Sequence, residues 1–283
     1  MKIAIASGKG GTGKTTISTN LVTTLAINGQ DVQYIDCDAE EPNGHIFLKP
    51  SIEQSEDVTV GVPHVNLDAC TGCGKCADLC QYSSIICLKD KPLLFEELCH
   101  SCGGCMEICP QKAITETNRK IGEAEYGKAK DVGFYHGRLD IGAIQTPAII
   151  KHLKKKMSDT AITVIDAPPG TSCPVIEAIK DTDFVLLVTE PTPFGLNDLK
   201  LAVGMVEEMG IAFAVAINRC DGGDDSVVEY CKESNIEIML QIPEERKIAE
   251  SYSKGVMIVE ALPHYKDSFL DLYNRIEKAV TKR

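Results

Sequence analysis

A glycine-rich stretch at residues 7–16, SGKGGTGKTT, restricts the fold of this chain more than any other feature. It follows a short apolar run, Lys2–Ala6, and precedes a helical pattern from Lys14 to about Asn28. A strand, a glycine loop and a helix in this order form a phosphate-binding loop, because the missing Cβ atoms let backbone N–H groups close on phosphate oxygens. The N-terminus of the helix adds positive potential. The pattern G-x-x-x-x-G-K-T therefore predicts a Walker A nucleotide site.

The expected nucleotide contacts come from this loop. They are Gly8, Lys9, Gly10, Gly11, Thr12, Gly13, Lys14, Thr15 and Thr16. We expect Lys14 to reach the β- and γ-phosphates of ATP and to be catalytic, and we expect the Thr15 hydroxyl to bind Mg²⁺. A generic Walker A loop does not require a lysine at position 9, so Lys9 is either a solvated loop charge or a residue with a special task.

Two further apolar runs, residues 31–35 and 161–165, predict strands that end in acidic side chains. These are Asp36 and Asp38 after the first run and Asp166 after the second. The carboxyl ends of parallel strands face the ligand crevice of an open sheet. Asp166 is therefore the expected Walker B carboxylate, which holds Mg²⁺ through a water. For Asp36 and Asp38 the alternative is that both only cap a loop.

Cysteine spacing is the second strong constraint. Of the 13 cysteines, eight lie in two runs with the spacing C-x-x-C-x-x-C-x-x-x-C, which is the spacing of bacterial ferredoxins. The first three thiols of each run bind one 4Fe–4S cluster, and the fourth binds the cluster of the other run. The predicted ligand sets are Cys70, Cys73, Cys76 and Cys109 for one cluster, and Cys80, Cys99, Cys102 and Cys105 for the other.

Zinc and a disulfide scaffold are the alternatives for these thiols. Structural zinc sites usually pair two well-separated C-x-x-C units, whereas each run here has three thiols within seven residues. The chain enters its first strand without a signal peptide, which predicts a cytoplasmic protein, where thiols are more often metal ligands than disulfides. Gln81 departs from the ferredoxin pattern, which has proline there. Outside the runs, Cys173 is expected to be a small residue buried at a helix start.

Together these motifs resemble one family. The loop K-G-G-T-G-K-T, the D-C-D after the second strand, the cysteine block, D-A-P-P-G-T-S-C, T-E-P-T-P-F-G and N-R-C-D resemble the MinD-superfamily P-loop ATPases that carry an inserted ferredoxin domain. The resemblance covers nearly the whole chain. It implies a fold like those of MinD and the nitrogenase iron protein, and a dimer that encloses nucleotide, formed with a second copy or with a paralogous ATPase.

The resemblance also implies roles for individual residues. Lys9 crosses the dimer interface to the nucleotide of the partner, and Asp38 positions the attacking water. Asp36 lies in the second coordination shell of Mg²⁺. Asn218 reads the adenine edge, and Pro243 borders the base.

The implied fold class is α/β, with a doubly wound, mostly parallel sheet that is interrupted in sequence. Residues 1–56 and 143–283 form the P-loop ATPase domain. Residues 63–115 form an inserted bacterial ferredoxin-like α+β domain with two 4Fe–4S clusters. Residues 57–62 and 116–142 are expected to form a small antiparallel add-on that joins the two.

Composition argues against two classes of partner. The formal charge of −12 argues against nucleic acid, whose binding needs clustered Lys and Arg. The sequence contains no run of 18 apolar residues, so we expect no membrane span. A C-terminal helix has an apolar stripe, which predicts core packing rather than membrane binding because no basic face accompanies it. The stripe consists of Tyr265, Phe269, Leu272, Tyr273, Ile276 and Val280.

Three functions fit these features. In each of them the protein is an ATPase that uses Mg-ATP and two 4Fe–4S clusters. The first is electron transfer to a partner protein, gated by ATP binding and hydrolysis. The second is an iron–sulfur cluster carrier or assembly ATPase. The third is a regulatory or positioning ATPase whose clusters sense redox state. Two complete ligand sets in one chain, and the lack of a C-x-x-C pair outside the insertion, favour the first over the second.

Overall fold

The apolar runs of the chain pair into one nine-stranded sheet with the order β11-β10-β9-β1-β8-β2-β7-β6-β3. The computed structural model describes residues 1–282. Neighbouring strands from β11 to β7 are parallel, and β6 and β3 extend the sheet antiparallel. The strands are β1 (Lys2–Ala6), β2 (Val32–Asp36), β3 (Ser51–Val65), β6 (Ile114–Ala129), β7 (Val132–Leu139), β8 (Ile162–Asp166), β9 (Phe184–Thr189), β10 (Ala212–Asn218) and β11 (Ile238–Ile242).

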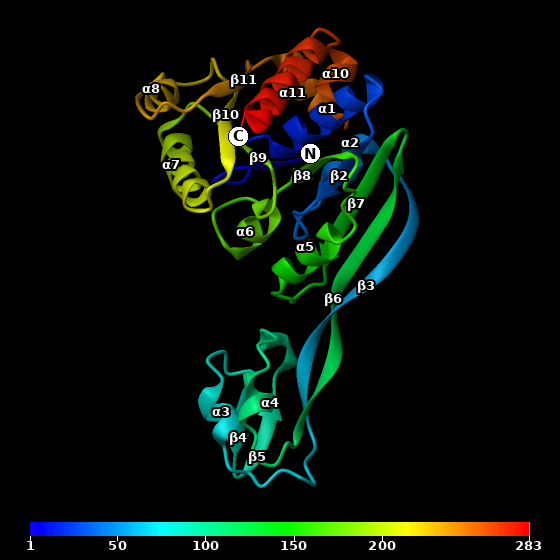
Figure 1. Cartoon of the computed structure of the whole chain (residues 1–283), viewed down its shortest axis with the longest axis vertical. Helices are drawn as coiled ribbons and strands as arrows, with labels where there is room; N and C mark the ends of the chain where they lie inside the picture. Colours follow the sequence, from blue (N-terminus) through cyan, green and yellow to red (C-terminus); the bar gives the residue numbers. More distant parts are fainter. Residues whose placement is uncertain (283) are drawn as a thin grey trace.

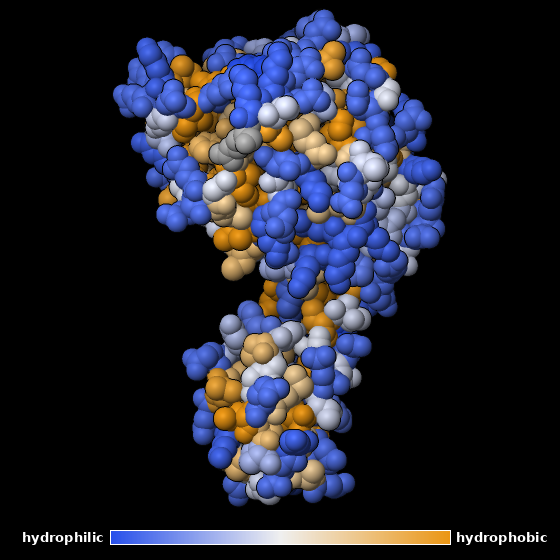
Figure 2. Space-filling model, viewed as in Figure 1, coloured by the Kyte–Doolittle hydropathy of each residue, from blue (hydrophilic) through white to orange (hydrophobic). Residues whose placement is uncertain are grey.

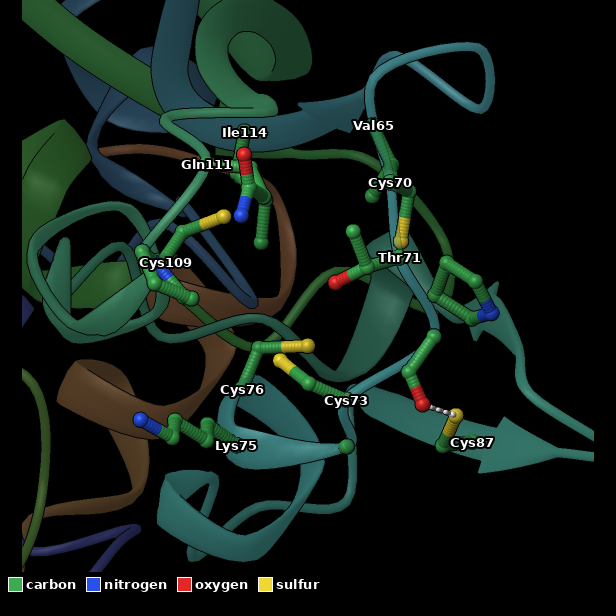
Figure 3. Close-up of a pocket in the computed structure, with 14 residues that line it drawn as sticks. Val65, Cys70, Thr71, Cys73, Lys75, Cys76, Cys87, Cys109, Gln111 and Ile114 are labelled. Atoms are coloured by element: carbon green, nitrogen blue, oxygen red, sulfur yellow. Dashed lines mark hydrogen bonds between the residues drawn. The ribbon is translucent and has the colours of Figure 1, made fainter.

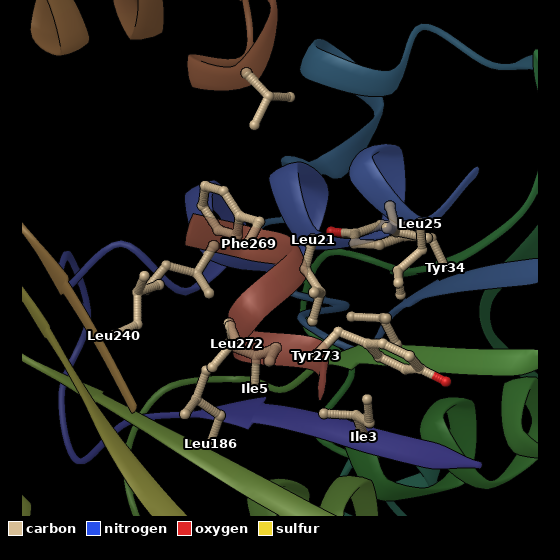
Figure 4. Close-up of a cluster of buried hydrophobic side chains, with 14 of the residues drawn as sticks. Ile3, Ile5, Leu21, Leu25, Tyr34, Leu186, Leu240, Phe269, Leu272 and Tyr273 are labelled. Carbon is tan, nitrogen blue, oxygen red and sulfur yellow. The ribbon is translucent and has the colours of Figure 1, made fainter. Parts of the chain in front are cut away.

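Helices cover both faces of this sheet. They are α1 (Lys14–Ile27), α2 (Gly44–Leu48), α5 (Thr146–Lys154), α6 (Cys173–Ile179), α7 (Pro193–Glu208), α8 (Ser226–Glu233), α9 (Arg246–Ser253), α10 (Ile258–Ala261) and α11 (Tyr265–Thr281). On one face, α1 and α11 bury side chains such as Leu21 and Phe269 over Ile3 and Ile5 of β1 (Figure 4). On the other face, α5, α6, α7 and α8 pack in a second hydrophobic cluster. The predicted doubly wound, mostly parallel sheet is therefore confirmed.

The C-terminal stripe packs in the core as predicted. Its buried members are Tyr265, Phe269, Leu272, Tyr273 and Ile276, and Val280 packs against them partly buried. Burial of this stripe removes apolar surface from water, which stabilises α11 on the sheet. Over residues 1–282, no helix combines the length and the apolar character needed to cross a bilayer.

The segments expected to form a separate add-on belong to the central sheet instead. β7 pairs in parallel with β2, and β6 pairs antiparallel with β7, so the sheet continues through them without a break. β3 begins at Ser51, well before residue 57. The acidic stretch 53–57 is part of this exposed edge strand. Charged side chains suit such an edge because they discourage pairing with other chains. The expected antiparallel pairing is present, but it is continuous with the central sheet rather than an addition to it.

A long ribbon of β3 and β6 leaves the sheet and carries a small lobe, residues 66–113 (Figure 1). In the space-filling view the lobe is joined to the larger part through a narrow waist, where hydrophobic side chains are visible (Figure 2). The lobe contains α3 (Lys75–Leu79), α4 (Gly104–Ile108), a 3₁₀ turn (Glu96–Leu98) and the hairpin of β4 (Ile85–Leu88) and β5 (Lys91–Leu94). Lys89 and Asp90 adopt positive φ angles of 49° and 61°, as a tight two-residue hairpin turn requires.

Candidate functional site

The phosphate-binding loop lies at the carboxyl end of β1, where Gly13 leads into α1. Gly13 has a φ of 98°, and a Cβ there would lie 2.5 Å from the side-chain nitrogen of Asn218. Only glycine fits this position, because both the backbone angle and the space exclude a side chain. Asn218 Nδ2 donates a hydrogen bond of 2.9 Å to the carbonyl of Thr12. The residue predicted to read adenine thus contacts the phosphate loop itself.

Three carboxylates gather beside the buried side chain of Lys14, which is 7% exposed. Asp36 and Asp166 are register partners at the ends of the adjacent strands β2 and β8. Burial lowers the pKa of Lys14, while the charges of Asp166, Asp38 and Asp36 act to raise it. Burial also raises the pKa of Asp38 to about 6, against the pull of Lys14. The sequence-predicted loop and the acidic strand ends therefore form one charged site.

Asp36 shapes the loop that carries Asp38. Its carboxylate accepts the N–H of Asp38 at 3.1 Å and the N–H of Gly44 at 2.9 Å. These bonds match the loop-capping alternative, and they also hold Asp36 close to Asp166. Burial and the Asp166 charge raise the pKa of Asp36 well above its usual range. Asp38 is less buried and has no side-chain hydrogen bond to another side chain among residues 1–282.

The carboxylate of Asp166 has one oxygen that could hold Mg²⁺ or its water. Its Oδ2 accepts a hydrogen bond of 2.9 Å from the hydroxyl of Tyr34. Its Oδ1 is buried and has no hydrogen-bond partner within the described residues. Burial raises the pKa of Asp166, and the Thr15 hydroxyl and the Lys14 charge beside it oppose that shift. Thr15 and Asp166 would hold the cation, which would screen the phosphate charge when bound.

Tyr34 is a site residue that the sequence patterns do not identify. Its ring is fully buried in β2 and stacks on Phe134 of β7 at 5.7 Å. A buried tyrosine hydroxyl needs a partner, and here that partner is the Walker B carboxylate. No local pattern marks this pair, because 132 residues separate Tyr34 from Asp166.

We expect Tyr34→Phe to lower the free energy of unfolding by about 1–3 kcal/mol, because it leaves a buried carboxylate oxygen without its donor. Urea unfolding monitored by circular dichroism measures this change. Tyr252→Phe is the matched control, since Tyr252 is 50% exposed and its hydroxyl makes no hydrogen bond within residues 1–282. Equal stability of wild type and Tyr34→Phe would show that the bond to Asp166 contributes nothing.

The loops after β8 and β9 and the end of β10 contact the phosphate loop. Lys9 forms an ion pair with Glu190 at 3.5 Å, so within one chain its ammonium is neither free nor fully solvated. The N–H of Gly170 donates to the Ser7 carbonyl at 3.0 Å, which places the loop after Asp166 against the phosphate loop. Pro243 directly follows Ile242, the register partner of Asn218, so the two predicted base contacts lie at the ends of adjacent strands.

The two cysteine runs form two pockets in the small lobe, and each pocket combines both runs. The pocket that we call distal is lined by Cys70, Cys73, Cys76 and Cys109. Their side chains converge on one space, and Lys75 points away from it (Figure 3). The pocket that we call proximal is lined by Cys80, Cys99, Cys102 and Cys105. The structure thus brings together the two sets of thiols that the spacing predicted as ligand sets.

Local geometry explains why the two runs behave alike. Gly74 and Gly103 have φ angles of 77° and 73° directly before α3 and α4. This left-handed turn folds the leading thiols of each run back over a short helix. Thiolates in such loops are the usual ligands of 4Fe–4S clusters. Pro110 lines the distal pocket and Gln81 the proximal one, so the departure from the ferredoxin pattern falls on one pocket.

Two observations on the cysteines qualify the predictions. Among residues 1–282, no group of three or more His, Cys, Asp or Glu side chains is placed to hold a single metal ion. Cys173 is the first residue of α6, as expected for a helix start, but it is exposed rather than buried. The helix buries Val175 and Ala178 toward the core, and its first turn lies at the surface.

The sheet, the phosphate loop and the strand-end carboxylates define a P-loop nucleotide-binding protein of the α/β class. The chain belongs to the CobQ/CobB/MinD/ParA nucleotide binding domain family, whose sequence model matches residues 3–258. Membership of this family, which includes the MinD and ParA proteins, implies ATPase activity.

Individual proteins are similar to the chain over almost its whole length. It is 31% identical to an uncharacterized protein of Methanocaldococcus jannaschii, across 99% of this chain and 98% of that protein. It is 24% identical to the iron-sulfur cluster carrier protein of Pyrococcus horikoshii, across 99% of this chain and 86% of that protein. The solved structure of septum site-determining protein MinD from Pyrococcus horikoshii, complexed with Mg-ADP, is 25% identical, with a TM-score of 0.58 and coverage of 98% and 96%.

Proposed function

We propose that this protein is an iron–sulfur cluster carrier ATPase that holds two 4Fe–4S clusters in its small lobe. The pairing of the thiols carries the two-cluster part of the proposal, because each pocket receives three from one run and the fourth from the other. Relatives named iron-sulfur cluster carrier proteins support the carrier function. Sequence spacing by itself ranked electron transfer first, and the names of these relatives reverse that order.

The proposed domain division follows the lobe and its ribbon. The small lobe is a ferredoxin-like insertion, and the distal and proximal pockets are its two cluster sites. The sheet and its helices form the ATPase part. In that part Lys14 and Thr15 bind Mg-ATP with Asp166, Asp38 orients the attacking water, and the active form is a dimer that encloses nucleotide.

Cluster transfer tests this function directly. The protein is loaded with iron and sulfide without oxygen, and iron analysis should find about eight irons per chain for two cubanes. The loaded protein is then mixed with a cluster-free acceptor enzyme whose activity returns when a cluster enters it. We expect Mg-ATP to speed this return. A stoichiometric zinc content, or loaded protein that never activates the acceptor, would contradict the carrier function.

Electron transfer is the second candidate, because two complete ligand sets in one lobe favour clusters that stay in place. In that case the acceptor stays inactive, and the midpoint potentials of the clusters differ between MgADP and a non-hydrolysable MgATP analogue. Redox titration of the same loaded protein therefore separates the two functions.

A further inference from the structure

The N-terminus of α5 lies between the nucleotide site and the small lobe. Its N-cap residue Gln145 and its first residue Thr146 are polar but only 8% and 3% exposed. Each makes a hydrogen bond to a distant part of the chain, and the two bonds lead in different directions. Buried polar side chains of this kind hold the segments that they bond in one arrangement, because breaking the bond leaves a buried group unsatisfied.

Thr146 connects α5 to the loop that carries Asp38. Its hydroxyl donates a hydrogen bond of 3.0 Å to Glu40, two residues after Asp38. The N–H of Leu139, at the end of β7, donates to the carbonyl of Ala39 at 2.8 Å. The acidic loop is therefore bound on both its backbone and its side chain by the segment that leads into α5.

Gln145 connects the same helix end to a cysteine of the proximal pocket. Its Nε2 donates a hydrogen bond to the carbonyl of Cys99. Its Oε1 accepts the N–H of Ile144 at 3.3 Å, which fixes the orientation of the amide. Cys99 is itself buried in the hydrophobic cluster that contains Ile149 and Ile150 of α5. Arg119 of the ribbon adds a bond of 3.1 Å to the Glu96 carbonyl on the approach to Cys99.

Within the described residues, the distal pocket has no comparable connection. It lies where the ribbon ends, lined by Val65 and Ile114, whereas the proximal pocket is lined by Gly61 and Pro63, nearer the sheet. Cys109 accepts the N–H of Ala113 within the lobe. Over residues 1–282, we find no hydrogen bond or ion pair from the lining of the distal pocket to the ATPase part.

We propose that Gln145 and Thr146 are positioning residues that link the Asp38 loop to Cys99, so that nucleotide state controls cluster release from the proximal pocket and not from the distal one. The proposal rests on the proposed function, because it assigns the two pockets to clusters. Loops that contact the γ-phosphate order and relax with nucleotide state. A shift of the Asp38 loop would move Glu40, and the N-terminus of α5 would pass that shift to the backbone of Cys99.

Chelation of cluster iron tests this link in proteins that hold one cluster. Cys109→Ser leaves the proximal pocket intact, and Cys80→Ser leaves the distal one. A ferrous-iron chelator removes the iron in the presence of MgADP or of a non-hydrolysable MgATP analogue. We expect the two nucleotides to change the release rate about fivefold or more from the proximal pocket, the lower end of usual coupling between sites. Release from the distal pocket should change less than about twofold.

Variants of α5 separate positioning from folding. Gln145→Glu keeps the side-chain size but replaces the donor with a carboxylate, and Thr146→Val keeps the shape but removes the hydroxyl. In the Cys109→Ser protein both should abolish the nucleotide effect while iron content and nucleotide affinity stay unchanged. Thr146→Ser should restore it. Gln30→Glu, at an exposed position, is the matched control and should retain the full effect.

The outcomes are separable from those of the proposed function. An equal nucleotide effect on both pockets, or a full effect in both Gln145→Glu and Thr146→Val, overturns the link. If Gln145→Glu loses its cluster, Thr146→Val alone tests the link, because Thr146 bonds Glu40 and not Cys99. Nucleotide-dependent release without activation of an acceptor keeps the link and rejects the carrier function. Loaded protein with no cluster iron rejects both.

Discussion

Lys14→Ala should weaken ATP binding and lower ATP hydrolysis by about a hundredfold or more, the size expected when a preorganised donor to the transition state is removed. The Lys14 ammonium is buried beside Asp36, Asp38 and Asp166, so no water can replace its charge at the phosphates. Without it, the three carboxylates also repel the nucleotide. Binding of a fluorescent ATP analogue and steady-state release of phosphate measure the two effects.

Lys9→Ala provides the comparison from the same loop. The Lys9 side chain is 31% exposed and pairs with Glu190 in its own chain, away from the buried carboxylates. We expect this variant to keep most of the binding but to lose hydrolysis and ATP-induced dimerisation, because the proposed role of Lys9 lies across the dimer interface. Sedimentation with and without Mg-ATP measures the association. If both lysine variants lose binding equally, Lys9 acts within its own chain.

Cys109→Ser should remove the cluster of the distal pocket and halve the iron content, from about eight to about four atoms per chain. Cys109 belongs to the second run in the sequence but lies with Cys70, Cys73 and Cys76 of the first run. Cys80→Ser should cause the same loss from the proximal pocket. Iron and sulfide analysis gives the content, and EPR of the reduced protein shows which of two signals disappears.

Cys87→Ser is the control for the loss of a thiol from the same pocket. Cys87 lines the distal pocket, but its thiol donates to the Gly72 carbonyl rather than joining the four converging side chains (Figure 3). This variant should keep about eight irons. A halved iron content in Cys87→Ser would show that Cys87, rather than Cys109, is the fourth ligand of the distal cluster. Loss of both signals in Cys109→Ser would show that the two pockets fold as one unit.

Several parts of this protein follow from local spacing. The glycine loop between β1 and α1, the hairpin turn at Lys89 and Asp90, and the buried stripe of α11 each depend on residues a few positions apart. Backbone sterics and amphipathic periodicity decide such elements, and both are visible in a short window of sequence. The crossed sets of cysteines were predictable for a related reason, since repeated spacing makes the two runs equivalent.

Other parts needed the tertiary structure. β7 looks like a polar add-on in the sequence, yet its Phe134 is fully buried, because Tyr34 of the neighbouring β2 and the hydrophobic cluster beneath α1 supply the partners that a local window lacks. The pairing of Tyr34 with Asp166, and the bonds from α5 to Glu40 and Cys99, join residues 46 to 132 positions apart. The sequence by itself predicted a phosphate-binding loop and grouped the thiols into two sets, because those chemistries require fixed short spacings. Only the fold decided how the two sites are connected, because that connection depends on which distant segments the sheet and its ribbon bring into contact.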